Sequence, residues 1–514
     1  MSKPNILIFM TDQQRGDTIF PYERAKTPHI TAFCKEGLSF AQAHTVAPHC
    51  CPSRATFFSG LYPSQHGVWN NVNVGNTLSK GLYKGVHLFS EALREDGYRM
   101  YYGGKWHVSN LESQQDRGFD VARVPRPYER KDYEHEAPLQ REWDKYEGYR
   151  VKDKREEGEI IRPGYGTYTH YGLDECPKND KKVIDDAIDI ILNRHTVDQE
   201  EYGETYIRNH GGKDFDQRPW CQMIAPNGPH DPYFVPQRFL DMYPIETIQL
   251  PKSYKDRMLD KPGLYRKTRD RFDQLSEREH KEAIRHYLAL CSYEDDLFGQ
   301  VLEALEASGE ADNTLVLYVS DHGDYMAEHG LWCKGLPCFK GAYHIPAAMR
   351  WPKGIKNPGR IIHDYITLAD FAPTFLDVCG IEPSMKMTGK SLLPYMQDQQ
   401  PEHVQDALFT QSNGNELYGI QRSITTKAWK YVYNGFDYDE LYNLEEDPHE
   451  MVNVLDAYQD SPILKALSSR LWSFARETGD VCINQYVMVS LAPFGPGVIY
   501  ESSCDEEHPE KGMR

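Results

Sequence analysis

Short, uninterrupted apolar runs recur along the chain, and segments of helical periodicity lie between them. The four clearest runs occupy residues 6–10, 98–102, 220–224 and 314–320. Continuous apolar runs of this length are typical of parallel strands that are buried on both faces. Between the last two runs, apolar residues recur at near-helical spacing from 284 to 305, which predicts a long amphipathic helix. This alternation of strands and helices predicts an α/β fold.

Polar residues with complementary chemistry follow each of the four runs. Open α/β sheets bind their ligands at the carboxyl ends of the strands, so these residues are candidates for one common site. Taken singly, most of them are explained as well by a helix cap or a solvated surface position. The candidates are Asp12, Gln13, Lys105, His107, His230, Asp321, His322 and Lys334. Their agreement as a set favours a functional interpretation.

The last part of the chain has a different pattern. Beyond about residue 398, short strand-like segments at 423–426, 430–433 and 440–444 are separated by turns, and a helical pattern follows at 463–478. The predicted units are a large domain over residues 1–397 with a variable insertion at about 121–212, a small α+β domain over 398–482, and an irregular tail over 483–514.

Composition narrows the classes of function. The formal net charge of −19 argues against a nucleic-acid partner, because such proteins need clustered positive charge. The 11 cysteines are odd in number and scattered, which is typical of free thiols in a reducing compartment. A strand-like run follows the first few residues directly, and no apolar run reaches transmembrane length. We therefore expect a cytoplasmic enzyme with no membrane partner.

The most demanding motif is Cys50-Cys51-Pro52-Ser53-Arg54. Adjacent cysteines are often buried small hydrophobic residues, and they also occur in thiolate metal sites, although the paired spacing of structural zinc is absent here. The order cysteine, spacer, proline, serine, arginine resembles the motif of type I sulfatases, which belong to the alkaline-phosphatase-like superfamily. The residues after the motif have a sequence typical of a helix, so Cys50 is expected near a helix N-terminus, where negative charge is favoured.

The resemblance implies a fold and a nucleophile. The expected fold is a large mixed sheet flanked by helices, with a smaller C-terminal domain of antiparallel sheet plus helix. In the family, a formylglycine-generating maturation enzyme oxidises the motif cysteine to formylglycine (3-oxoalanine), and a hydroxyl of the hydrated aldehyde attacks sulfur. Cys50 matches that position, and Arg54 is expected to support the hydrate.

Other segments resemble further sulfatase signatures. Gly104-Lys105-Trp106-His107 is similar to the second signature, in which Lys105 would hold the sulfate and His107 would contact the formylglycine hydroxyl. Pro229-His230-Asp231-Pro232 carries a matching His230. Asp321-His322-Gly323-Asp324 is similar to the third sulfatase signature, and Lys334 follows it as the signature's lysine does. The resemblance implies that His107 is a base and that Lys334 or His230 protonates the leaving alcohol.

The resemblance also implies a divalent cation. The family ligands map onto Asp12, Gln13, Asp321 and His322, together with the modified residue 50. Calcium is the expected ion. Gln13 stands where the family has a second acid, and His322 adds a nitrogen donor, so magnesium and manganese remain alternatives.

The implied reaction is hydrolysis of a sulfate monoester, and the predicted substrate is a small sulfated saccharide. The Tyr- and Arg-rich segment at about 121–212 offers aromatic faces for sugar rings and guanidinium groups for acidic substituents. One alternative is a phosphonate monoester or phosphodiester hydrolase, since those formylglycine enzymes also carry Asp-Gln at the metal position. Another is a non-catalytic, metal-dependent binding protein, which the intact lysine and histidine set argues against. An oligomer is compatible with the sequence.

Overall fold

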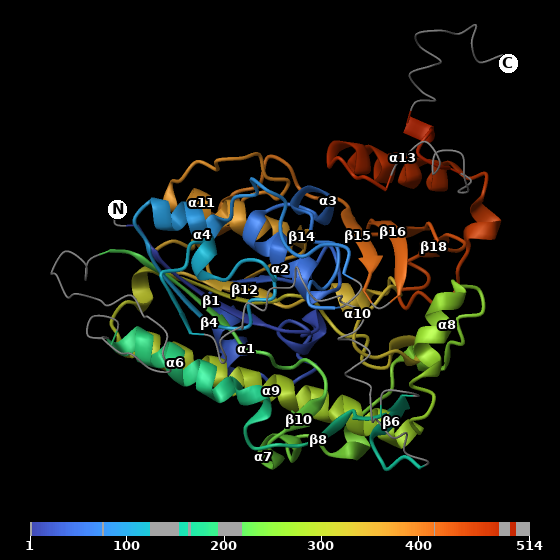
Figure 1. The fold of residues 1–514 in the computed structure, drawn as a ribbon, viewed down its shortest axis with the longest axis horizontal. Coiled ribbons are helices and arrows are strands. Elements are labelled where there is room, and N and C mark those ends of the chain that lie inside the picture. Colours follow the sequence, from blue (N-terminus) through green and yellow to red (C-terminus); the bar gives the residue numbers. More distant parts are fainter. Residues whose placement is uncertain are drawn as a thin grey trace, which may run out of the picture.

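The computed structural model describes residues 3–74, 77–123, 154–162, 166–193, 218–415, 417–482 and 494–499. Its centre is an eight-stranded mixed sheet, coloured by sequence in Figure 1, with the strand order β13-β2-β12-β11-β1-β9-β4-β5. The strands are β1 (Asn5–Thr11), β2 (Leu38–Phe40), β4 (Arg99–Gly104), β5 (Val121–Arg123), β9 (Trp220–Ala225), β11 (Thr314–Ser320), β12 (Ala347–Arg350) and β13 (Arg360–Ile362).

The four central strands are parallel neighbours. β1 pairs in parallel with β11 and β9, and β4 pairs in parallel with β9. β12 runs antiparallel to β11, which makes the sheet mixed. The four predicted apolar runs are these four central strands, so the strand predictions are confirmed. Their carboxyl ends meet at one edge of the sheet, where the polar residues follow.

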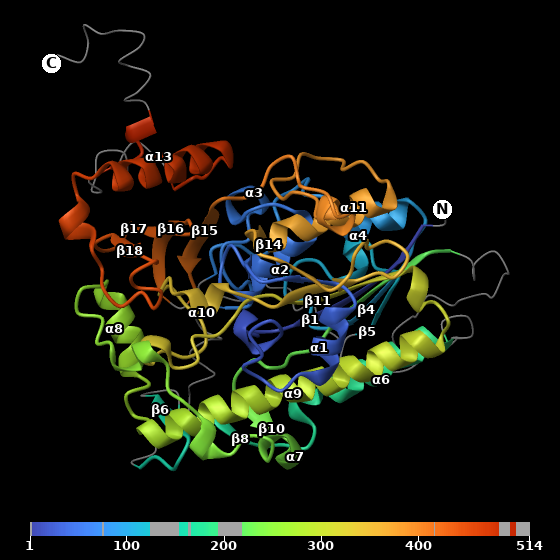
Figure 2. The same ribbon diagram turned by 180° about the vertical axis from the view of Figure 1, so that it is seen from behind.

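The apolar runs are continuous because the sheet is covered on both faces. In β1, Ile6 and Ile8 pack into one core cluster, and Leu7 and Phe9 pack into the cluster on the other face. Figures 1 and 2 show α9, α1 and α6 on one face and α2, α4 and α11 on the other. The bounds are α1 (Pro28–Lys35), α2 (Cys50–Ser59), α4 (Phe89–Glu95), α6 (Asp180–Asn193), α9 (Glu277–Ala307) and α11 (Phe371–Cys379). The predicted long amphipathic helix is α9.

A separate four-stranded antiparallel sheet follows in the chain, with the order β15-β16-β17-β18. It consists of β15 (Leu408–Gly414), β16 (Tyr418–Thr425), β17 (Trp429–Asn434) and β18 (Glu440–Asn443), and α13 (Pro462–Glu477) packs on it. The predicted fold class is therefore confirmed. Strand β15 was not predicted from the sequence.

The middle of the chain contains more regular structure than its sequence suggests. Its described parts include β6 (Glu159–Arg162), β7 (Gly166–Thr169), β8 (Tyr171–Leu173) and helix α6. The other parts of the predicted substrate segment, at 124–153, 163–165 and 194–212, lie outside the described residues, as do 483–493 and 500–514 of the predicted tail.

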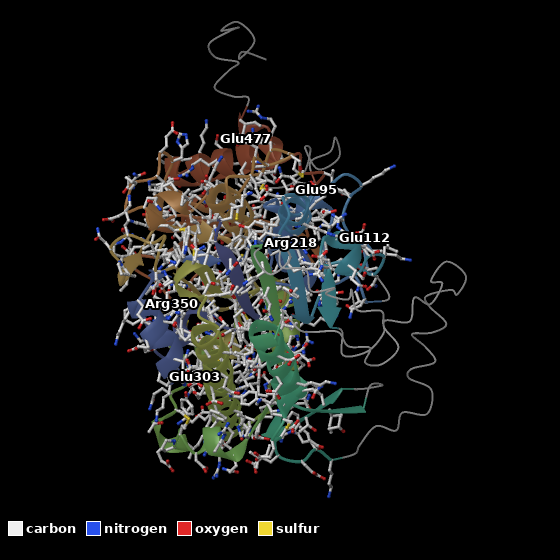
Figure 3. All side chains as sticks on the ribbon, turned by 90° about the vertical axis from the view of Figure 1, so that its left-hand side faces the viewer. Glu95, Glu112, Arg218, Glu303, Arg350 and Glu477 are labelled. Carbon is white, nitrogen blue, oxygen red and sulfur yellow. The ribbon has the colours of Figure 1, made fainter. Side chains whose placement is uncertain are left out.

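Three of the acidic side chains that Figure 3 labels, Glu95, Glu303 and Glu477, are exposed, whereas other charged side chains are buried, among them Asp12 and Asp321. Among the described helices, none is both long enough and apolar enough to cross a membrane.

Candidate active site

Helix α2 places residue 50 at its own N-terminus. The helix begins at Cys50, its N-cap His49 has extended backbone dihedrals, and all ten of its residues are buried. Phe57 and Phe58 anchor it in the main core cluster. The helix ends at Gly60, whose φ of 70° is the left-handed conformation that closes a helix. A fully packed helix holds the residue at its first turn in a fixed position.

Four buried side chains from three segments meet at this point. Asp12 follows β1, Cys50 begins α2, and Asp321 and His322 follow β11. One potential ligand atom from each lies within 4.8 Å of those of the others. The Sγ atom of Cys50 is 3.2 Å from Nε2 of His322 and 3.8 Å from Oδ1 of Asp12. In a formylglycine, a hydrate oxygen would stand where this Sγ stands.

Arg54 binds the carboxylates of both Asp12 and Asp321. It lies one helical turn after Cys50, on the same face of α2. Its Nε donates to Oδ2 of Asp321 at 2.8 Å, and its Nη2 donates to Oδ2 of Asp12 at 3.1 Å. Its Nη1 donates to the carbonyl oxygen of Lys105 at 2.7 Å. The guanidinium therefore binds the Oδ2 atom of each carboxylate, while Oδ1 of Asp12 faces residue 50 and Oδ1 of Asp321 accepts the backbone N–H groups of Gln13 at 3.1 Å and His322 at 2.9 Å.

The donor set fits a divalent cation. Nδ1 of His322 lies 2.9 Å from the carbonyl oxygen of Gly323, so Nδ1 carries a hydrogen. Burial acts to lower the pKa of His322, but the charge of Asp321 raises it, so Nε2 is a position that either a proton or a cation can fill. That Nε2 is 3.7 Å from Oδ1 of both Asp12 and Asp321. These three atoms therefore lie close enough together to share one cation. Carboxylate oxygens suit calcium or magnesium, and the imidazole also admits manganese.

Gln13 makes a different set of contacts. Its Nε2 donates to Oδ2 of Asp324 at 2.7 Å and to Oδ1 of Asp231 at 3.2 Å. Its Oε1 accepts a hydrogen bond from Nζ of Lys334 at 2.6 Å. An acid at this position would repel both carboxylates, which gives a physical reason for an amide here. The amide oxygen Oε1 has a second lone pair that is not used by Lys334 and that a cation can bind. Ligation of the metal by Gln13 therefore stays a prediction.

Two lysines bring positive charge to the surroundings of residue 50. Nζ of Lys105 is 2.5 Å from Oδ2 of Asp12 and 3.4 Å from Sγ of Cys50. Nζ of Lys334 is 2.6 Å from Nε2 of His230. Burial acts to raise the pKa of the Cys50 thiol, but the charges of Lys105 and Lys334 lower it well below its usual value. The surroundings therefore favour an anionic group at position 50.

The two histidines are held in defined orientations. Nε2 of His107 lies 3.0 Å from Oδ1 of Asn73, so Nε2 carries the hydrogen and the buried Nδ1 has a lone pair, and the His107 side chain interacts with Cys50. Nδ1 of His230 lies 2.7 Å from the backbone carbonyl oxygen of Asp231, so its Nε2 accepts from Lys334. Burial and the neighbouring Lys105 lower the pKa of His107, which keeps its imidazole neutral.

The loop that carries His230 is fastened by Asp180. This carboxylate, at the first residue of α6, accepts the backbone N–H groups of Asn227 at 2.8 Å and Gly228 at 2.7 Å. The carbonyl oxygen of Gly228 in turn accepts the N–H of Asp12 at 3.0 Å. Sequence reasoning missed Asp180 and Asn73, because both act from distant segments and stand in no motif. Asp324, which binds Gln13, was visible within the Asp-His-Gly-Asp run.

Comparison with known proteins identifies the family. Residues 4–381 match the sulfatase family, and residues 327–477 match the C-terminal region described for N-sulphoglucosamine sulphohydrolase. A choline-sulfatase of Rhizobium meliloti is 29% identical over 469 residues, covering 88% of this chain and 83% of that protein. An N-acetylglucosamine-6-O-sulfatase of Bacteroides thetaiotaomicron is 23% identical over 525 residues, covering 88% of this chain and 82% of the relative.

Solved structures share the fold. A structure in complex with its substrate, D-glucosamine-2-N,6-O-disulfate, gives a TM-score of 0.68 at 20% identity, covering 93% of this chain and 99% of the other. The phosphonate monoester hydrolase of Agrobacterium radiobacter gives a TM-score of 0.66 at 21% identity, covering 93% and 96%. Since the family match spans residues 4–381, the chain belongs to the sulfatase family and is a sulfuric ester hydrolase.

Proposed function

We propose that this enzyme hydrolyses a sulfate monoester on a small saccharide, with a formylglycine formed from Cys50 and a bound divalent cation. The observation that carries the proposal is the buried cluster of Asp12, Cys50, Asp321 and His322 with two lysines beside it. A sulfate ester resists attack because its oxygens are anionic, and convergent cationic groups lower that barrier.

The proposal gives each residue near position 50 a role. A formylglycine there supplies a hydrated aldehyde whose hydroxyl is the nucleophile, and a cation held by Asp12, Asp321, His322 and Gln13 supplies Lewis acidity. Lys105 and Lys334 bind the sulfate oxygens. Arg54 holds the two carboxylates in place, as its contacts with Asp12 and Asp321 support.

Protons move at two histidines in this proposal. After the sulfuryl group has moved to one hydroxyl of the hydrate, Nδ1 of His107 takes the proton of the other hydroxyl, so that the C–O bond to sulfate breaks, sulfate leaves and the aldehyde re-forms. The lone pair on that buried nitrogen supports this role. On the other side, Lys334 and His230 form a hydrogen-bonded pair, and this pair gives a proton to the leaving alcohol. The maturation enzyme that converts Cys50 is the expected protein partner.

The saccharide preference is supported from two directions. The relatives include an N-acetylglucosamine-6-O-sulfatase, and one structural neighbour was solved with a glucosamine disulfate. In this chain, the hydroxyl of Tyr168 donates to Oδ2 of Asp231, next to His230, so an aromatic residue of the middle segment does reach the site.

We further propose residues 1–397 as the catalytic domain and 398–482 as the small domain, which the separate cluster under β15–β18 supports.

A second candidate function uses the same site on a phosphonate monoester or phosphodiester. The Asp12-Gln13 pair and the likeness to phosphonate monoester hydrolases favour it. The test compares kcat/KM for a sulfated monosaccharide, an aryl sulfate and an aryl phosphonate monoester, with enzyme co-expressed with the maturation enzyme. We expect the saccharide sulfate to be hydrolysed most efficiently. A preference of orders of magnitude for the phosphonate would replace the proposal with this second candidate.

A further inference from the structure

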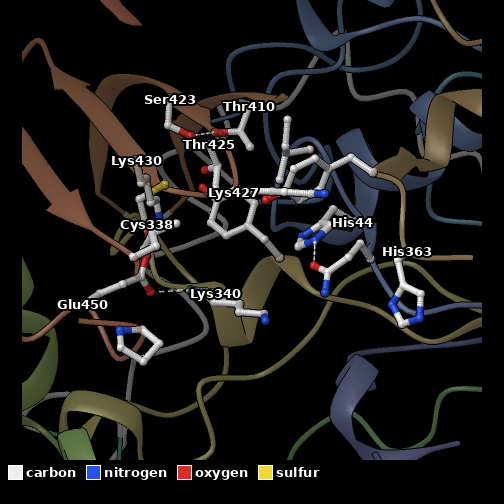
Figure 4. A pocket seen from close by; sticks show the side chains of 16 residues that line it. His44, Cys338, Lys340, His363, Thr410, Ser423, Thr425, Lys427, Lys430 and Glu450 are labelled. Carbon is white, nitrogen blue, oxygen red and sulfur yellow. Dashed lines mark hydrogen bonds and ion pairs between the residues drawn. The ribbon is translucent and has the colours of Figure 1, made fainter. Parts of the chain in front are cut away.

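A cavity of about 380 Å³ lies between α10 (Lys340–Tyr343) and the strands β15, β16 and β17 (Figure 4). The ammonium group of Lys430 in its wall is neutralised by Glu450 at 2.6 Å. This buried pair is therefore satisfied within the protein. A lysine with different contacts, Lys178, lies beside the active site.

Lys178 lies in the turn that precedes α6, and its side chain reaches the loop that carries His230. Its Nζ donates to the carbonyl oxygen of Asp231 at 3.2 Å and to that of Pro232 at 3.3 Å. Among the residues that the structure describes, no carboxylate lies within ion-pairing distance of this ammonium group. Burial lowers the pKa of Lys178, although the charge of Asp231 opposes this effect. A partly buried lysine without an ion pair is costly, which indicates that its two contacts matter.

The carbonyl oxygen of Asp231 is shared by Lys178 and His230. Nδ1 of His230 lies 2.7 Å from this oxygen. Because a carbonyl oxygen has two lone pairs and can only accept, it binds both donors and keeps the hydrogen of His230 on Nδ1. Nε2 of His230 then meets Nζ of Lys334 at 2.6 Å. The orientation of His230 thus depends on an oxygen that Lys178 holds.

The imidazole of His230 also has a competing acceptor. Oδ1 of Asp231 lies 3.2 Å from the same Nδ1 atom. If the carbonyl oxygen of Asp231 moved, the ring would turn toward this carboxylate, and Nε2 would leave its place beside Lys334. The two hydrogen bonds from Lys178 oppose that movement, since they join the carbonyl oxygens of two consecutive residues to one ammonium group.

One short turn holds the His230 loop at both ends. Asp180 accepts the backbone N–H groups of Asn227 at 2.8 Å and Gly228 at 2.7 Å, at the start of the loop. Lys178 binds the two carbonyl oxygens at its other end. A carboxylate thus binds the N–H groups and an ammonium group binds the carbonyl oxygens, so both contacts are charge-assisted.

The backbone of this turn is strained. Lys178 and Asn179 have φ values of 55° and 61°, in the left-handed region that favours glycine. Gln13 and His107 at the candidate active site share this feature, with φ values of 70° and 52°. Such strain persists only where surrounding contacts enforce it, and it concentrates at functional sites. The turn therefore belongs with the active site in its backbone conformation as well as in its contacts.

We propose that Lys178 is a positioning residue for the departure of the leaving alcohol. It holds the carbonyl oxygen of Asp231, and that oxygen orients His230 so that the Lys334–His230 pair is aligned with the ester oxygen. When the bond between sulfur and this oxygen breaks, the electron pair of the bond stays on the oxygen, which takes one proton from the pair. This inference rests on the proposed function, in which the pair is the proton donor.

The test compares kcat/KM for two aryl sulfates of similar shape, because kcat/KM includes the step in which the phenol departs. 4-Nitrophenyl sulfate has a good leaving group that needs little protonation, whereas 4-methoxyphenyl sulfate has a poorer one. We expect Lys178→Met to lower kcat/KM at least about tenfold for the methoxyphenyl ester and less than about threefold for the nitrophenyl ester. Lys178→Arg keeps a charged donor and should recover most of the loss.

The matched control is Lys181→Met. Lys181 lies three residues further along, on the exposed surface of α6, where it pairs with Asp185. This variant should behave as the wild type does with both esters. The melting temperature of each variant checks that it is folded, and Lys178→Gln, a smaller change, provides the same ratio of the two esters if Lys178→Met is unstable.

Three outcomes would overturn the inference. They are equal losses for the two esters in Lys178→Met, which would indicate a merely structural role, no loss with either ester, and a loss in Lys178→Arg as large as in Lys178→Met. Failure of the proposed function would instead appear in the wild type, as a preference for phosphonate esters over sulfate esters. The ratio of variant to wild type can be measured with the same two phenols in either ester class, so the two failures are distinguishable.

Discussion

At the scale of single residues, Arg54 organises the candidate site through three hydrogen bonds to fixed partners. A planar guanidinium can reach Asp12, Asp321 and the carbonyl oxygen of Lys105 at once, whereas a lysine ammonium on the same backbone cannot. The charge of the residue is therefore less important than its geometry.

Arg54→Lys is expected to lower kcat at least about tenfold and to reduce the bound metal, because the two carboxylates lose their fixed orientation. Steady-state kinetics and elemental analysis measure both effects. The matched control is Arg422→Lys, a buried arginine whose guanidinium binds Asp480 in the C-terminal part of the chain. That variant should lose stability and keep its metal. Equal metal and activity in Arg54→Lys and the wild type would contradict the role given to Arg54.

His66 gives the fold a predictable response to acid. Its Nδ1 accepts the N–H of Val68 at 3.1 Å, so the hydrogen lies on Nε2, 3.1 Å from Oγ1 of Thr56 in α2. Burial lowers the pKa of His66 from 6.5 to about 3. Below pH 6.5 the unfolded chain binds a proton that the folded chain does not bind. The stability contributed by this group is therefore complete above pH 6.5 and is lost as the pH falls toward 3.

We expect His66→Gln to have a shallower dependence of the free energy of unfolding on pH than the wild type, by about 1.4 kcal/mol per pH unit below about pH 6. Urea titrations at several pH values measure the two slopes. Above pH 7 the two slopes should agree. Parallel slopes from pH 4 to 6 would show that His66 is protonated in the folded state.

At the scale of elements, the end of β4 sets the position of Lys105. Gly104 has a φ of 93°, and a Cβ there would lie 2.1 Å from the carbonyl oxygen of Ala225 in the neighbouring β9. The glycine therefore permits both the left-handed backbone and the close approach of the two strands. Lys105 continues this pairing, since its N–H donates to the same carbonyl oxygen at 2.8 Å.

Gly104→Ala should lower stability and also kcat, because β4 must move away from β9 and take Lys105 with it. Gly97→Ala is a matched control, since Gly97 also has a φ of 93° but its Cβ would meet nothing within 4 Å. The control should cost about 1–2 kcal/mol from its backbone conformation alone, and Gly104→Ala should cost about 1–3 kcal/mol more from the clash. Thermal unfolding and kinetics measure the difference. Equal losses in both variants would mean that the strands tolerate the added atom.

At the scale of the whole molecule, much of the fold was predictable because its signals are local. The strands that carry the site are continuous apolar runs, and their parallel order brings Asp12, Lys105 and Asp321 to one edge. What could not be predicted depends on contacts between distant segments. Asp180 fastens the loop of His230 from a helix about 50 residues earlier in the chain. Strand β15 likewise meets a distant segment, since the N–H of Gln411 donates to the carbonyl oxygen of Val46 at 2.8 Å.

The proposed function depends on the chemistry of residue 50. The most direct test is peptide mass spectrometry of the active enzyme, purified after co-expression with a formylglycine-generating enzyme, alongside a sulfate-ester assay on the same sample. We expect formylglycine at position 50 and an unmodified cysteine at position 51, with activity that rises in proportion to the converted fraction. Full activity from protein in which residue 50 is entirely thiol would contradict the account.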